Sequence, residues 1–185
     1  MQTRGQRNNN PLNIRRSADR WKGARTEQTD KNFVQFETMA YGYRAAWKVL
    51  ESYWKYFHDL PKPFNVRNII SRWAPPTEND TENYIRTVVK LSGLGGNENF
   101  PQPSRGECYE RLELLVRAMT TVECGIPYRE VDVTSIREGF DLAFPGRRKV
   151  KKRRKAPETP VDAGVSQLPH MKGTTFGCWD EYWDW

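Results

Sequence analysis

The chain has few of the residues that bind zinc or form disulfides. Its 185 residues include two histidines, His58 and His170, and three cysteines, Cys108, Cys124 and Cys178. The two histidines are far apart in sequence, which leaves little from which to build a histidine-based zinc site or a Ser-His-Asp triad. An odd number of cysteines at spacings that match no metal-ligand pattern argues against a disulfide framework. We therefore expect reduced thiols, no metal and no cofactor.

Long apolar segments are also absent. No stretch approaches the roughly 20 apolar residues that cross a bilayer, and the polar amino terminus has no apolar signal core. We therefore expect no membrane span, synthesis in the cytoplasm, and delivery by other means if the protein reaches a cell wall.

Basic residues are plentiful and are concentrated near the carboxyl end. The formal net charge is +7, which favours polyanionic partners such as nucleic acid, lipid headgroups or teichoic-acid-bearing walls. A basic run covers Arg147–Lys155, and the last ten residues, Phe176–Trp185, mix aromatic and acidic side chains. Such a run repels itself and cannot bury enough surface to fold. We expect a folded domain over residues 1–145 and, over residues 146–185, a disordered tail made of a basic linker and an acidic aromatic terminus.

Apolar residues recur at helical spacing in the first 145 residues, which predicts a mainly α domain. The segment before Lys31 is polar and is expected to be a loop or short hairpin anchored by Trp21, while Trp47 and Trp73 suit core packing better than sugar stacking. The expected helices are 39–59, one capped by Asn65 that ends at Trp73, one capped by Asn79 that ends at Gly93, one capped by Ser104 that ends before Gly125, and 135–144.

An ordered series of short motifs resembles a family of small phage and prophage proteins described as structural or lytic virion proteins. The series departs from the family pattern at Leu12, where glycine is usual, and at Cys124, where asparagine is usual. Its motifs are Arg7-Asn8-Asn9-Asn10-Pro11-Leu12-Asn13-Ile14-Arg15, Trp21, Gly23, Asp30, Phe33, Phe36, Tyr41-Gly42, Arg44-Ala45, Trp73-Ala74-Pro75, Glu78-Asn79-Asp80-Thr81, Tyr84, Ala118-Met119, Glu123, Gly125, Pro127-Tyr128 and Gly139.

The resemblance implies a fold and a reaction. The family looks like part of the lysozyme and lytic-transglycosylase superfamily, so residues 1–145 are expected to form a compact lysozyme-like, murein-hydrolase-type domain. In that superfamily a catalytic Glu ends one helix and an Asn-rich segment forms the opposite wall of the cleft. Here the Asn-rich segment comes first and the Glu-bearing helix comes late, which implies a circularly permuted order.

Glu123 is the candidate general acid. Glycosidic cleavage needs a carboxyl group that is still protonated near neutral pH, and Glu123 follows apolar residues at the carboxyl end of a helix, where the helix dipole disfavours negative charge. The alternative is an ordinary exposed Glu in a last helical turn. Asp30 and Glu37 are the candidates for a second carboxylate, which direct hydrolysis needs and a transglycosylase route assisted by the sugar's acetamido group does not. Their alternative roles are a turn cap and a solvent-facing side chain.

Amide and guanidinium donors gather in the Asn-rich segment. Such donors suit sugar hydroxyls and acetamido carbonyls, although Asn-Pro clusters are also common turn formers. The expected substrate-binding residues are Asn9, Asn10, Asn13, Arg15, Trp21 and Tyr128.

Three functions remain open at this point. The first is a bacteriophage virion-associated enzyme that degrades the peptidoglycan of the cell wall and is joined to other virion proteins through its tail. The second is a structural virion protein of the same fold without activity, held in the particle by its basic, Trp-rich tail. The third is a virion protein that binds nucleic acid through Arg147–Lys155.

Overall fold

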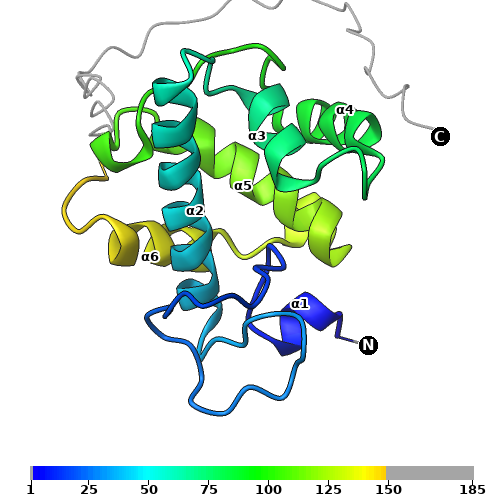
Figure 1. Cartoon of the computed structure of the whole chain (residues 1–185), viewed down its shortest axis with the longest axis vertical. Helices are drawn as coiled ribbons and strands as arrows, with labels where there is room; N and C mark the ends of the chain where they lie inside the picture. Colours follow the sequence, from blue (N-terminus) through cyan, green and yellow to red (C-terminus); the bar gives the residue numbers. More distant parts are fainter. Residues whose placement is uncertain (1, 149–185) are drawn as a thin grey trace, which may run out of the picture. The chain divides into compact units, whose positions relative to one another are not determined.

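A long helix, α2, is the element against which the folded region is built (Figure 1). The computed structural model describes residues 2–148, which belong to one compact unit. Its elements are α1 (Arg4–Arg7), α2 (Met39–Asp59), α3 (Val66–Trp73), α4 (Thr81–Ser92), the 3₁₀ turn η1 (Pro103–Arg105), α5 (Tyr109–Cys124), the 3₁₀ turn η2 (Tyr128–Glu130) and α6 (Val133–Ala143).

Helix α6 packs along α2 at close range. Trp47 on α2 is fully buried, and its indole N–H donates to the Ile136 carbonyl at 3.1 Å. Gly139 makes the close approach possible, because a Cβ there would lie 2.5 Å from the Tyr43 Cβ. The expectation that Trp47 is a core residue is confirmed.

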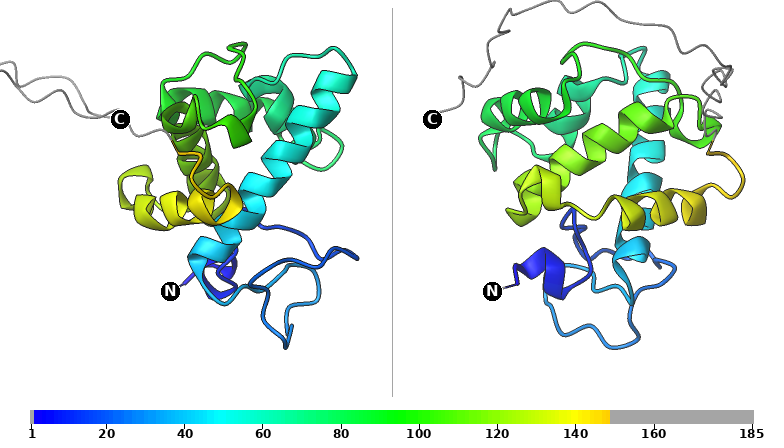
Figure 2. Two further views of the ribbon diagram at one scale, coloured as in Figure 1. Left: turned by 90° about the vertical axis from the view of Figure 1, so that its left-hand side faces the viewer. Right: turned by 180° about the vertical axis from the view of Figure 1, so that it is seen from behind.

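Helix α5 crosses the unit beside α4, α6 and α1 (Figure 2). Leu112, Leu115 and Met119 on α5 are fully buried in the core. Val122 continues the helical spacing of these apolar residues but is 36% exposed. The row of buried side chains therefore ends at Met119, about one turn before the end of the helix. This leaves the last turn of α5 at the edge of the core rather than inside it.

Three of the predicted helix starts are wrong for identifiable reasons. Helix α6 begins at Val133 rather than at residue 135, because the Asp132 side chain caps it by accepting from the N–H groups of Thr134 and Ser135. The side chain of Asp80, rather than Asn79, caps α4 by accepting from the Asn83 N–H. Ser104 does not cap α5, because its hydroxyl and its backbone N–H both donate to the carboxylate of Glu51. The predicted extent of α2, the Asn65 cap of α3 and the left-handed glycine after α4 are confirmed.

The amino-terminal segment covers the start of α2 (Figures 1 and 2). It contains the short helix α1 and two isolated antiparallel bridges, Arg15 with Phe33 and Ala24 with Phe36, so the expected loop or hairpin is a loop that begins with a helical turn. Its backbone reaches α2 at Gly42, where a Cβ would lie 2.0 Å from the Asn9 carbonyl oxygen. Only glycine permits this contact.

The mainly α fold class is confirmed for residues 2–148. No helix within this range is long and apolar enough to cross a membrane. The predicted tail lies outside the described residues from residue 149 onward. Of the basic run, Arg147 and Arg148 are described, and the Arg148 guanidinium pairs with Asp141 on α6 at 2.8 Å.

Candidate functional site

A pocket of about 440 Å³ opens at the carboxyl end of α5. Its walls come from three parts of the chain: the amino-terminal segment, the end of α3 with the loop that follows it, and the last turn of α5. The side chains that line it are Asn13, Arg15, Phe33, Arg72, Trp73, Ala74, Pro75, Glu78, Asn79 and Glu123.

The carboxyl group of Glu123 is the half-buried acid of this pocket. Tyr84 donates its hydroxyl to Oε1 at 3.0 Å, and the Asn13 amide donates to Oε2 at 2.8 Å. Burial raises the pKa of Glu123 above its ordinary value, whereas hydrogen bonds from Asn13, Tyr84 and Trp73 act in the opposite direction. The acid is thus fixed in position by donors on both oxygens while burial favours its protonated form.

Local backbone geometry brings Asn13 to Glu123. Asn13 has a φ of +49°, in the left-handed region that asparagine tolerates better than most residues, and its N–H donates to the Asn10 carbonyl at 3.2 Å to close a tight turn. The same Asn13 amide also donates to the Glu123 backbone carbonyl at 3.3 Å. The Cys124 thiol donates to the Pro11 carbonyl at 3.2 Å, so two side chains, those of Asn13 and Cys124, hold the turn against the end of α5.

An ion pair joins two walls of the pocket. Arg15 from the amino-terminal segment contacts Glu78 from the loop after α3 at 2.9 Å, and their side chains are 74% and 58% exposed. Glu78 is a second carboxylate in the lining, beside the acid of Glu123. An exposed pair of this kind contributes little to stability, so either partner is free to exchange its contacts for a ligand.

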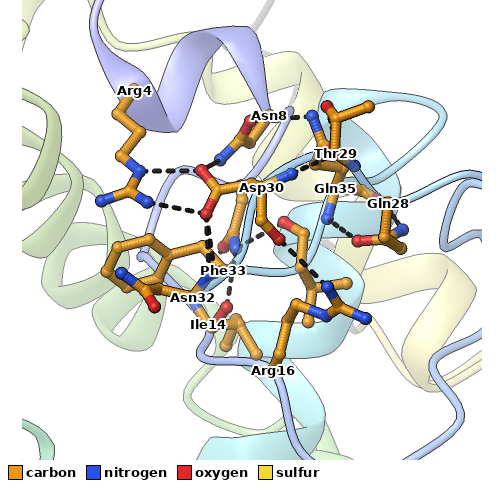
Figure 3. A network of polar contacts seen from close by, with 12 residues as sticks. Arg4, Asn8, Ile14, Arg16, Gln28, Thr29, Asp30, Asn32, Phe33 and Gln35 are labelled. Carbon is orange, nitrogen blue, oxygen red and sulfur yellow. Dashed lines mark hydrogen bonds and ion pairs between the residues drawn. The ribbon is translucent and has the colours of Figure 1, made fainter.

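Asp30 has a full set of partners elsewhere (Figure 3). Its carboxylate accepts two hydrogen bonds from Arg4 at 2.7 Å, one from Asn8, and two from the backbone N–H groups of Asn32 and Phe33. These contacts, the Arg4 hydrogen bond foremost, hold the pKa of Asp30 well below its usual range. Asp30 is not among the residues that line the pocket, and its observed contacts fix the amino-terminal loop.

Glu37 and two of the predicted binding asparagines also lie outside the pocket lining. Glu37 is exposed, and its backbone carbonyl accepts from the Asn9 amide at 3.0 Å. Asn10 is fully buried; its amide donates to the carbonyls of Ile14 and Val34 at 2.9 and 2.8 Å, and its oxygen accepts from the Ile14 N–H. The side-chain amides of Asn9 and Asn10 thus donate to backbone carbonyls.

Trp21 and Tyr128 occupy two further places. Trp21 lines a separate hollow of about 620 Å³ beside Arg16 and Arg25 in the amino-terminal segment. The Tyr128 ring lies 4.2 Å from the guanidinium of Arg117, whose Nε donates to the Tyr128 carbonyl. Of the residues predicted for catalysis or binding, Glu123, Asn13 and Arg15 are the ones that come together in one pocket.

Most of the pocket lining was not among the predicted site residues, and the omissions that matter most for its chemistry are Trp73, Glu78 and Tyr84. Trp73 was expected in the core, and Tyr84 lies within a predicted helix. Periodicity does not distinguish a core side chain from one at the rim of a pocket, and Trp73 is half-buried. The signal was present in the family motifs, because Trp73-Ala74-Pro75, Glu78-Asn79 and Tyr84 all belong to the quoted series.

The pocket offers proton chemistry and hydrogen bonding. Within residues 2–148, no group of three or more His, Cys, Asp or Glu side chains is arranged to hold a metal ion. The lining combines one acid with a raised pKa, one exposed carboxylate, amide and guanidinium donors, and the rings of Phe33 and Trp73. Such a set suits a polyhydroxylated ligand with a flat apolar face.

Replacing Tyr84 by Phe should raise the pKa of Glu123 further. The change removes a donor that favours the charged carboxylate, and one hydrogen bond to a charged group corresponds to about one pH unit. Carbon-13 NMR titration of the Glu123 carboxyl carbon measures the shift. Tyr128→Phe is the matched control, because Tyr128 lies outside the pocket. A pKa in Tyr84→Phe that is unchanged or lower would show that the hydroxyl does not donate to this carboxylate.

Comparison with known proteins gives one informative relative. No protein-family model matches the chain. The chain is 36% identical to Protein P5 of Pseudoalteromonas phage PM2 over 148 residues, which span 77% of this chain and 83% of the relative. Identity at this level over most of both sequences establishes common ancestry, and the chain belongs to the family of the bacteriophage protein P5.

Proposed function

We propose that the protein is a virion-associated enzyme that cleaves the glycan of peptidoglycan, with Glu123 as the general acid. The observation that carries the proposal is the Glu123 carboxyl group, which lines an open pocket, accepts hydrogen bonds from Asn13 and Tyr84 and has a raised pKa. Membership in a phage protein family supports the assignment to a virion.

The proposed reaction begins with proton transfer from Glu123. The protonated carboxyl group gives its proton to the glycosidic oxygen as the bond to the sugar breaks, and positive charge develops on the sugar ring. Arg15 and Asn79 offer donors to sugar hydroxyls and acetamido carbonyls, and the Trp73 ring offers an apolar face to a sugar ring. The Asn13 amide positions Glu123, to which it donates both of its hydrogen bonds.

The developing charge on the sugar needs a nucleophile. Glu78 is the second carboxylate of the pocket, whereas the five hydrogen bonds of Asp30 and the exposed position of Glu37 favour structural and solvent-facing roles for them. Because Glu78 is mostly exposed and paired with Arg15, we assign the nucleophilic role to the acetamido group of the substrate. The acetamido oxygen bonds to the anomeric carbon as the bond to the leaving oxygen breaks, and the leaving oxygen keeps the proton of Glu123. Water, or a hydroxyl of the same sugar, then opens this cyclic intermediate and gives its proton to the Glu123 carboxylate, which leaves a reducing or an anhydro end. Such a reaction needs one protein acid and no protein nucleophile.

A zymogram on purified peptidoglycan, followed by mass analysis of the released fragments, tests the proposal. Glycan cleavage gives sugar ends, with anhydro or reducing termini, whereas an endopeptidase on the same fold gives free peptide ends. Intact peptidoglycan after incubation with the full chain, or only peptide ends among the fragments, would refute the proposed activity.

Glu78→Gln should retain glycan cleavage within about tenfold of the wild type, since neutralising an exposed carboxylate removes one substrate contact and no reacting group. The measurement is the initial rate of peptidoglycan solubilisation, with Glu82→Gln as the control, because Glu82 is also an exposed glutamate paired with an arginine but lies outside the pocket. A loss comparable to that of a Glu123 variant, with reducing sugar ends in the wild-type products, would make Glu78 the second catalytic carboxylate instead.

A further inference from the structure

A second pocket adjoins the one that contains Glu123. Its volume is about 350 Å³, and it shares Arg72 and Pro75 with the first pocket, so these two side chains form the boundary between them. The rest of its lining consists of Tyr56, Phe57, Lys62, Asn68 and Ser71. The second hollow therefore lies next to the place where a polymer would sit beside Glu123.

The lining of the second pocket is cationic. It contains Lys62 and Arg72 but no carboxylate, and neither cation forms an ion pair with any residue in the 2–148 range. The Arg72 guanidinium lies 3.7 Å from the centre of the Tyr56 ring and 5.0 Å from that of Tyr53. Stacking holds the guanidinium plane in place and leaves its N–H groups available at the edge.

We propose that this second pocket binds a carboxylate of the peptide that branches from the glycan strand. The inference rests on the proposed function, because it takes the sugar of that strand to lie in the Glu123 pocket. A stacked guanidinium presents the two-pronged donor edge that matches a carboxylate, and Lys62 adds a second positive charge beside it. Ser71 and the amide oxygen of Asn68 supply neutral polar atoms for the peptide backbone, whereas the Asn68 amide nitrogen donates to the Pro63 carbonyl at 2.8 Å.

Binding of the Lys62→Ala chain to two forms of the same wall polymer tests the assignment. One preparation is purified peptidoglycan with its peptides, and the other is the same material freed of peptides by an amidase; cosedimentation at fixed ionic strength gives the Kd for each. The Lys62→Ala chain is compared with a chain that keeps Lys62. Both chains carry Glu123→Gln so that the polymer stays intact. We expect Lys62→Ala to weaken binding about tenfold on the peptide-bearing form and to leave binding to the stripped form unchanged.

Lys90→Ala is the matched control, because Lys90 is an exposed lysine outside both pockets. If Lys62→Ala lowers the affinity equally for the two preparations, or for neither of them, the carboxylate assignment is overturned. The pocket could instead take a phosphate group, and inorganic phosphate added as a competitor at matched ionic strength tests this alternative. If phosphate displaces the chain that keeps Lys62 from the polymer but does not displace the Lys62→Ala chain, the pocket is a phosphate site and the carboxylate assignment fails.

The two proposals fail in different ways. Lys62-dependent binding to peptide-bearing polymer, together with no cleavage by the wild-type chain, would refute the enzymatic function and leave the pocket assignment standing. Cleavage by the wild-type chain without any effect of Lys62→Ala would refute the pocket assignment alone.

Discussion

Glu123→Gln is expected to lower kcat for peptidoglycan cleavage by about a hundredfold to ten-thousandfold, the contribution typical of a positioned general acid. Gln has nearly the same shape as Glu, and its oxygen still accepts from Asn13 or Tyr84, so the pocket keeps its walls. It has no proton to give to the leaving oxygen. The measurement is the rate of glycan-end formation from purified peptidoglycan under saturating substrate, with KM expected to change little.

Glu110→Gln is the matched control for this experiment. Glu110 is an exposed glutamate on the same helix, in its first turn, and outside the pocket. Its substitution should leave the rate unchanged. Retention of more than about a tenth of the wild-type rate by Glu123→Gln would remove Glu123 from the reaction. If the wild-type chain also cleaves nothing, a passive phage component becomes the better account.

Thermal unfolding separates a catalytic effect from a folding defect in the same variant. The pKa of Glu123 is raised in the folded chain because burial disfavours the charge, so folding opposes ionisation of this group. Its contribution to stability is therefore fully present below the ordinary pKa of 4.5 and is lost as the pH rises through the folded pKa. At neutral pH Glu123→Gln should be at least as stable as the wild type, and this advantage should shrink as the pH falls towards 4.5.

Asn10→Ala should lower the free energy of unfolding by roughly 2–5 kcal/mol, because it leaves two buried backbone groups, the Ile14 N–H and the Val34 carbonyl, without partners. The Ile14 carbonyl loses the Asn10 amide but keeps the Val34 N–H. The contacts of Asn10 join the two sides of the amino-terminal loop through one side chain. In a region of this size the corresponding fall in Tm is roughly 10 °C. Differential scanning calorimetry and urea titration measure the two quantities.

Asn32→Ala is the control for this prediction. Asn32 belongs to the same loop, but it is exposed and its side-chain amide has no hydrogen-bond partner within residues 2–148, so its substitution should change Tm by little. If Asn10 instead acts by binding substrate, Asn10→Ala would keep the wild-type Tm and raise KM. That result would contradict the structural role that its three hydrogen bonds assign to it.

The sequence predicts the helices better than it predicts their starts. The extent of α2 follows from a long apolar stripe with prolines after it, and the structure places the helix over the predicted residues. The Ser104 prediction is wrong because capping-box spacing is a local signal, whereas Ser104 donates to Glu51, which is 53 positions away. A side chain that has a stronger distant acceptor is not available to cap its own helix.

The same limit applies to the site. Glu123 could be proposed from its place at the end of an amphipathic helix, but nothing local indicates that the loop with Pro75 and Glu78 faces it. The asparagine cluster shows the limit most clearly, because an amide suits a sugar and a backbone carbonyl equally well. In the structure the amides of Asn9 and Asn10 donate to backbone carbonyls, whereas the Asn13 amide donates to the carboxylate of Glu123. Only the fold distinguishes these three neighbours.

The hydrogen bond between Asn13 and Glu123 joins positions 110 residues apart. A ribosome releases the amino-terminal turn long before it has made the end of α5, so throughout most of synthesis the acid and its donor are not present together. A growing or prematurely terminated chain that ends before residue 123 contains the turn without the acid. Any activity that depends on this contact therefore requires a chain that extends at least through the end of α5.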